Sequence, residues 1–239
     1  MRKTCCIPRL AMQIALVATV LFAKTEFVGC SCVCAEEPRD FAKVVESLAS
    51  PNPAPIIEEY NIKKVPDGYD MSAQKKVYAA WDTLLHAGTI AFPFVIAKYD
   101  DDRYCSTIES ALSGAEHNKR VGEICREIID GQITPCGIWT TGKGDPRSRP
   151  LRPSYCRTFL GDLKSAKQWW EEHKDKKLYE IQAEALGWLI AEEEKLADPV
   201  FKEDVQVLKG QLDKIKATKT PLEGTRHQKT CRYGTGECG

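Results

Sequence analysis

Apolar residues recur at intervals of three and four positions along most of the chain beyond residue 40, the spacing of amphipathic helices. In the last such segment Phe201, Val205, Leu208, Leu212 and Ile215 alternate steps of four and three, which is typical of a helix packed on a neighbour. Together with capping residues such as Asp70 and Asp198, the pattern predicts helices over 40–49, 70–88, 89–99, 106–114, 120–130, 159–173, 178–196 and 199–216.

Proline and glycine separate these helices. The segments 50–55 (SPNPAP) and 64–68 (KVPDG) have the composition of turns. Residues 132–153 lose the helical pattern, and 135–153 hold four prolines, three glycines and four basic residues. No run of alternating apolar and polar residues is convincing as a strand. We therefore expect an all-α fold: a compact bundle of short helices with one long Pro/Gly-rich loop and no sheet.

The N-terminal segment has the pattern of a secretory signal peptide. Basic residues at positions 2, 3 and 9 precede fourteen uncharged residues from Leu10 to Ala23, fewer than the ~20 that a membrane span requires. Val33-x-Ala35 favours cleavage after Ala35, while Ala23 offers an earlier site. Phe27-Val28-Gly29-Cys30 loosely matches a lipobox, so the protein could instead be a lipoprotein anchored through Cys30. We expect an exported protein, periplasmic or extracellular.

This organisation predicts a signal peptide at 1–35, a helical domain at 36–216 and a polar, Cys-containing tail at 217–239. The chain has 34 basic and 34 acidic residues, and removal of the leader leaves a small acidic excess. A nucleic-acid partner would require a strong basic excess, so none is expected. We expect no membrane span in the mature chain, and a monomer.

The chain has eleven cysteines, of which five lie in the leader. An even number in an exported domain is typical of disulfide bonding. The candidates are Cys105, Cys125, Cys136, Cys156, Cys231 and Cys238. Cys136 and Cys156 flank the long loop and would close it as a staple of about 20 residues. Cys125 with Cys136 is an alternative, and Cys231 could pair with Cys238.

Two stretches carry likenesses to known proteins. Residues 70–99, two short helices joined by a glycine turn with an early proline in the second, resemble a single HEAT-type unit. Residues 79–195 combine a G-x-x-A-x-P helix, a D-x-R-Y turn and a Trp-Trp helix followed by E-x-Q-x-E. In these motifs the chain resembles a group of exported proteins of planctomycete-type bacteria. That resemblance implies export and one coherent domain, and it implies no activity.

Candidate binding residues cluster in the second half. Glu180 and Glu184 are four positions apart and share a helix face, as an acid/base pair would. Adjacent tryptophans cannot both face a core, so one of them could stack on a sugar or a peptide. The weak candidates for binding are Trp169, Trp170, Glu171, His173, Glu180, Glu184 and, beside the acidic turn 100–102, Arg103.

No motif identifies a catalytic residue, a metal site or a cofactor. G-x-S-x-G is absent, the phosphate-loop spacing around Lys143 is incomplete, and His86, His117, His173 and His227 show no metal-ligand spacing. The sequence favours a non-enzymatic exported helical domain that binds a protein, peptide or glycan. A carboxylate-dependent hydrolase and a lipid-anchored envelope protein are the alternatives.

Overall fold

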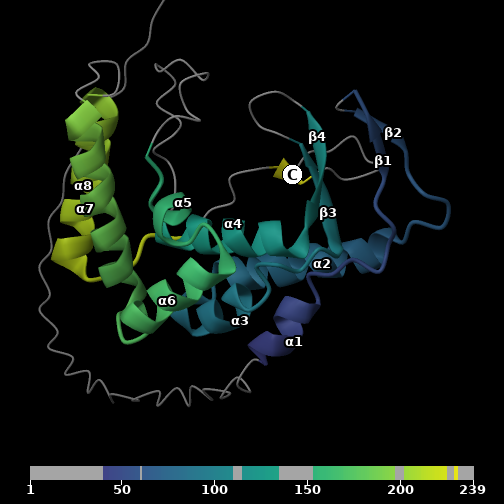
Figure 1. Cartoon of the computed structure of the whole chain (residues 1–239), viewed down its shortest axis with the longest axis horizontal. Helices are drawn as coiled ribbons and strands as arrows, with labels where there is room; N and C mark the ends of the chain where they lie inside the picture. Colours follow the sequence, from purple (N-terminus) through teal and green to yellow (C-terminus); the bar gives the residue numbers. More distant parts are fainter. Residues whose placement is uncertain are drawn as a thin grey trace, which may run out of the picture. The chain divides into compact units, whose positions relative to one another are not determined.

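The computed structural model describes residues 40–59, 61–109, 115–134, 153–196, 202–224 and 229–230. The elements follow one another as α1 (Phe41–Glu46), β1 (Ile56–Glu58), β2 (Asn61–Lys64), α2 (Met71–Leu85), the 3-10 helix η1 (Gly88–Ala91), α3 (Phe92–Ile96), β3 (Tyr104–Glu109), β4 (Glu116–Arg120), α4 (Val121–Ile133), α5 (Tyr155–Phe159), α6 (Leu163–His173), α7 (Leu178–Leu196), α8 (Lys202–Thr218) and β5 (Lys229–Thr230) (Figure 1).

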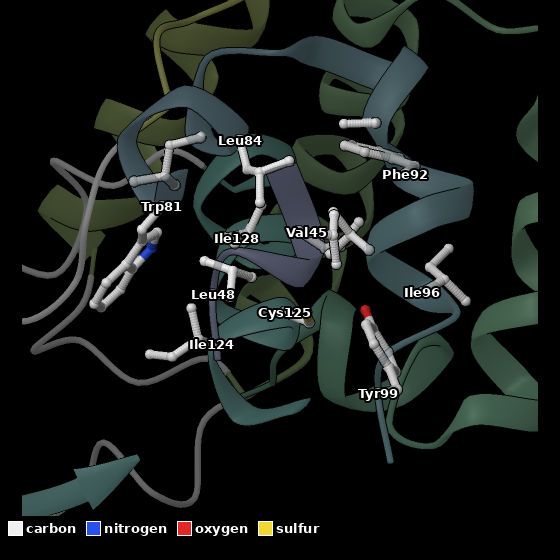
Figure 2. Packing of buried hydrophobic residues seen from close by; sticks show 14 of the residues in the cluster. Val45, Leu48, Trp81, Leu84, Phe92, Ile96, Tyr99, Ile124, Cys125 and Ile128 are labelled. Carbon is white, nitrogen blue, oxygen red and sulfur yellow. The ribbon is translucent and has the colours of Figure 1, made fainter. Parts of the chain in front are cut away.

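The main hydrophobic core surrounds α4. Ile124, Cys125 and Ile128 lie on its buried side and face residues of α2 and α3, including Leu84 and Phe92 (Figure 2). α7 packs on α4 from another side, and a second apolar cluster joins α7 to α8. Buried aliphatic and aromatic side chains on four helices therefore place most of the stabilising apolar area around α4.

The prediction of an all-α fold is wrong, because the structure has two small antiparallel sheets. β1 pairs with β2, and β3 lies between β4 and β5. Residues 106–109, predicted as helix, belong to β3, in which Cys105 to Ile108 are all buried. A strand buried on both faces shows no alternation of apolar and polar residues, so its pattern cannot be distinguished from that of a short helix.

Local capping explains a second difference in the helices. Instead of one helix over 159–173, the chain forms α5 and α6 with a break at 160–162. Asp162 caps α6 by accepting a hydrogen bond from the Ser165 N–H at 2.8 Å, and the Ser165 hydroxyl lies 3.2 Å from the Asp162 N–H. By contrast, α7 has the predicted bounds. Among the described residues, no helix is both long and apolar enough to cross a membrane.

The predicted disulfide framework is contradicted where the structure describes it, because Cys105, Cys125 and Cys156 are free thiols. Each contributes to a buried core as a small apolar side chain. Burial raises the pKa of the thiols of Cys105 and Cys156, and raises that of Cys125 to about 12. Cys136, Cys231 and Cys238 lie outside the described residues.

Candidate functional site

Three of the predicted binding residues meet where α5, α6 and α7 pack together. The ring of His173, at the end of α6, places Nε2 2.9 Å from Glu184 Oε1 on α7. Tyr155, the first residue of α5, donates its hydroxyl to the same oxygen at 2.8 Å. Trp169 donates its indole N–H to the Tyr155 hydroxyl at 3.1 Å. We call these residues and Lys176, which binds the other oxygen of Glu184, the Glu184 network.

Hydrogen bonds determine the charge of Glu184. Partial burial raises the pKa of its carboxyl, but the hydrogen bonds from Lys176, His173 and Tyr155 outweigh burial and lower the pKa to about 2. Burial, offset in part by the hydrogen bond from Trp169, raises the pKa of the Tyr155 hydroxyl. At neutral pH the network therefore combines an ionised carboxylate with an un-ionised phenol.

His173 is held from two sides. Its Nδ1 lies 2.7 Å from the carbonyl oxygen of Trp169, and its Nε2 faces the Glu184 carboxylate. Both neighbours are hydrogen-bond acceptors, so the ring makes both bonds only when both nitrogens carry hydrogen. The ring also stacks on Trp169, with centroids 4.4 Å apart and an interplanar angle of 13°.

This arrangement favours a structural role. A carboxylate with a pKa of about 2 is a poor general acid, and its two oxygens already accept three hydrogen bonds. Both nitrogens of His173 are directed at groups of the protein itself, the Trp169 carbonyl oxygen and the Glu184 carboxylate. The hydrogen bonds of the network connect α5, α6 and α7, and its polar groups are one another's partners.

The other predicted tryptophan and its acidic neighbours do not join this network. Trp170 is half-buried, with its ring 5.7 Å from that of Phe92 in an edge-to-face contact. Glu171 is exposed and pairs with Lys174 at 2.6 Å. Glu180 caps its own helix by accepting a hydrogen bond from the Lys177 N–H at 2.7 Å, which lowers its pKa. Glu180 and Glu184 are therefore engaged with different partners.

Arg103 is part of a separate ion-pair cluster. Its guanidinium binds Asp101 at 2.6 Å and Glu46 of α1 at 2.8 Å. Lys98 also pairs with Glu46. These contacts join α1 to the turn between α3 and β3. No group of three or more acidic, histidine or cysteine side chains among the described residues is arranged to hold a metal ion.

An open groove of about 570 Å³ lies between β1 and β4, lined by Ile57, Glu59, Glu116, His117 and Asn118. Side chains rather than strand pairing connect its two sides. The Asn118 side-chain amide donates to the carbonyl oxygen of Pro55 at 2.8 Å, and the Glu116 carboxylate accepts from the Ile62 N–H. Figure 1 shows the β1–β2 hairpin beside β4. We call this hollow the β1–β4 groove.

The sequence did not indicate two of these features, the position of Tyr155 and the β1–β4 groove. Tyr155 lies 29 positions before Glu184 in a segment without a helical pattern long enough to place it, although Ser154 is a recognisable cap. The β1–β4 groove depends on strands that the sequence pattern did not predict. Only the short polar run at 116–120, without an apolar residue, could have suggested an exposed edge strand.

Comparison with known proteins gives no match: no protein-family model, curated protein or solved structure is similar to this chain. The Glu184 network and the β1–β4 groove are therefore interpreted from their own geometry and chemistry.

Proposed function

We propose that this chain is an exported, non-enzymatic binding domain, and that its ligand is an extended segment of a partner protein that binds in the β1–β4 groove. The observation that carries the proposal is an open groove flanked by the edges of two separate sheets. Export is supported by the signal-peptide pattern of residues 1–35.

Strand edges favour an extended ligand. Among the described strands, β1 pairs with β2 alone and β4 pairs with β3 alone, so each has one edge that no described strand covers. Such edges offer main-chain hydrogen bonds to an added strand. Ile57 of β1 lines the groove and provides an apolar contact for the ligand.

Charge favours a basic segment. Glu59 and Glu116 bring two carboxylates to the groove lining, and among the described residues no Lys or Arg contributes to it. A lysine or arginine in the ligand would meet complementary charge, which improves specificity and the rate of association more than the affinity. The ligand class that best fits is therefore an extended peptide with a basic residue near its centre.

A pair of labelled peptides tests this proposal by fluorescence polarisation on the full chain. Both have the same alternating Val/Thr sequence, and one carries lysine and the other glutamate at its centre. We expect the lysine peptide to bind more tightly, and Glu59→Lys to weaken it by about fivefold.

Glu171→Lys on α6 makes the same charge change at an exposed position outside the groove and should leave peptide binding unchanged. Equal binding of both peptides, or equal effects of the two charge reversals, would refute the proposed site.

A further inference from the structure

Residues 219–224, which follow α8 and begin the predicted polar tail at 217–239, pack back onto the helical domain. We call residues 219–224 the strap, and Leu85, Gln132 and Gln182 the strap site. The strap runs from the end of α8 to a point where Gly224 lies against the carbonyl oxygen of Leu85, the last residue of α2. A β-carbon on Gly224 would lie only 2.4 Å from that oxygen, so this end of the strap requires glycine.

Gln182 binds the strap through its main chain. Its side-chain carbonyl accepts from the Leu222 N–H at 2.8 Å, and its side-chain NH₂ donates to the Leu222 carbonyl oxygen at 3.0 Å. The two bonds reproduce the way a neighbouring strand pairs with an extended residue. Leu222 itself is half-buried against the α7–α8 cluster and adds an apolar contact.

Hydrogen bonds to the main chain hold the side chains of the strap site in position for an extended segment. The NH₂ group of Gln182 also donates to the carbonyl oxygen of Gln132 at 2.7 Å, and that of Gln132 donates to the Leu84 carbonyl oxygen at 2.7 Å. Both glutamine side chains are buried. If the strap left, the buried carbonyl of Gln182 would lose its partner, which is costly in a protein interior. The site is therefore more stable with an extended segment in it than without one.

The junction between α8 and the strap is strained. Lys219 has φ +52°, in the left-handed region that non-glycine residues rarely adopt. Its N–H closes the last turn of α8 by donating to the Ile215 carbonyl oxygen at 2.8 Å. An extended conformation at Lys219 would relieve the strain but would carry the strap away from its own strap site.

We propose that the strap site is an exchangeable binding site whose second ligand is the strap of another copy of this chain, so that two copies form a tail-exchanged dimer at high protein concentration. A second copy has the same sequence, so its strap carries Leu222 and Gly224 at the spacing that the strap site binds. The strap contacts are the same in monomer and dimer, so relief of strain at Lys219 favours the dimer and dilution favours the monomer.

The first test compares two substitutions at Lys219 in the full chain, by light scattering after incubation at high concentration. Lys219→Gly removes the cost of a positive φ in the monomer and should therefore weaken dimerisation. We expect the association constant of the dimer to fall about fivefold or more. Lys219→Ala removes the same side chain but keeps the strain, so its dimerisation should match the unmodified chain. A chain that is monomeric at every concentration, or a glycine variant that dimerises as strongly as the alanine variant, overturns the proposal.

The second test mixes two damaged chains. Leu222→Asp disrupts the strap but leaves the strap site intact, and Gln182→Ala damages the site but leaves the strap intact. Exchange predicts a heterodimer in the mixture, in which one intact strap occupies one intact site, and no homodimer of either variant. If native mass spectrometry of the mixture detects no heterodimer while both variants keep their helical circular dichroism, exchange does not occur.

Discussion

At the scale of single residues, Glu184 is a strongly perturbed carboxylate where α5, α6 and α7 pack together. Its low pKa follows from three donors that come from three different segments: Tyr155, His173 and Lys176. The ionised form is therefore bound by the folded protein, whereas a proton on Glu184 would disrupt at least one of these hydrogen bonds. This linkage makes the network sensitive to acid.

We predict that Glu184→Gln lowers the free energy of unfolding by about 1 kcal/mol at pH 7, a value reduced for the 39% exposure of the side chain. The folded-state pKa of about 2 lies below the ordinary value of 4.5, so this stabilisation is present above pH 4.5 and is lost as the pH falls toward 2. Urea unfolding of both proteins from pH 7 to pH 2 should show a difference that shrinks below about pH 4.5.

Glu171→Gln is the matched control. Glu171 is exposed on α6, and it pairs with the exposed side chain of Lys174. It should change stability by less than about 0.5 kcal/mol. A difference between Glu184→Gln and the unmodified chain that persists unchanged at pH 2 would show that packing, rather than charge, accounts for the effect.

Sequence reasoning identified His173 and Glu184 as candidates but could not assign their roles. Both lie on helices whose pattern is clear, so their positions along α6 and α7 were predictable. The contact between His173 and Glu184 depends on the break at 160–162 and on the angle between α6 and α7. Both are features of the tertiary structure. Of the two adjacent tryptophans, Trp169 is buried against Tyr155 and His173, and Trp170 is the one that is partly exposed.

At the scale of elements, the longer helices α2, α4, α7 and α8 were predictable because each buries one face, and the strands were not. α4 keeps Ile124, Cys125 and Ile128 on one side, so its periodicity is visible in the sequence. β3 is buried on both faces, while β4 exposes most of its residues, and neither alternates. The pairing of the two depends on contacts that single-sequence patterns do not contain.

The junction of β4 and α4 depends on one close approach. The Gly122 N–H donates to the Asp101 carbonyl oxygen at 2.9 Å, and a β-carbon on Gly122 would lie 2.2 Å from the Tyr99 carbonyl oxygen. We predict that Gly122→Ala lowers the free energy of unfolding by about 3 kcal/mol, because backbone on both sides must move. Chemical denaturation followed by circular dichroism measures this loss.

Gly210 of α8 provides the opposite case. Nothing lies within 4 Å of a β-carbon built there, and the residue is in the interior of a helix. Gly210→Ala should therefore raise stability by about 0.5–1 kcal/mol. If both alanine variants change stability in the same direction, the close contact at Gly122 is not the reason for its glycine.

At the scale of the whole molecule, the free thiols of the described residues must be compatible with the predicted export. Oxidising compartments convert accessible thiols to disulfides, whereas Cys105 and Cys125 are fully buried and Cys156 is partly buried. Burial raises the pKa of all three and so suppresses the reactive thiolate. Their burial is compatible with an exported protein whose core is formed by packing.

The last prediction concerns the start of the mature chain. The basic residues at 2, 3 and 9, the uncharged run Leu10–Ala23 and the Val33-x-Ala35 pattern predict cleavage after Ala35. The mature protein would then begin at Glu36, four residues before Asp40 caps α1 by accepting a hydrogen bond from the Lys43 N–H at 3.3 Å. N-terminal sequencing and intact mass of the protein recovered from the exporting cell should give Glu36 and no acyl group.

A chain that begins at Lys24 would place the cleavage after Ala23, and an acylated Cys30 would make the protein a lipoprotein. A single Ala35→Asp substitution supplies the control, because a charge at the position before the cut should block processing there and leave the precursor mass.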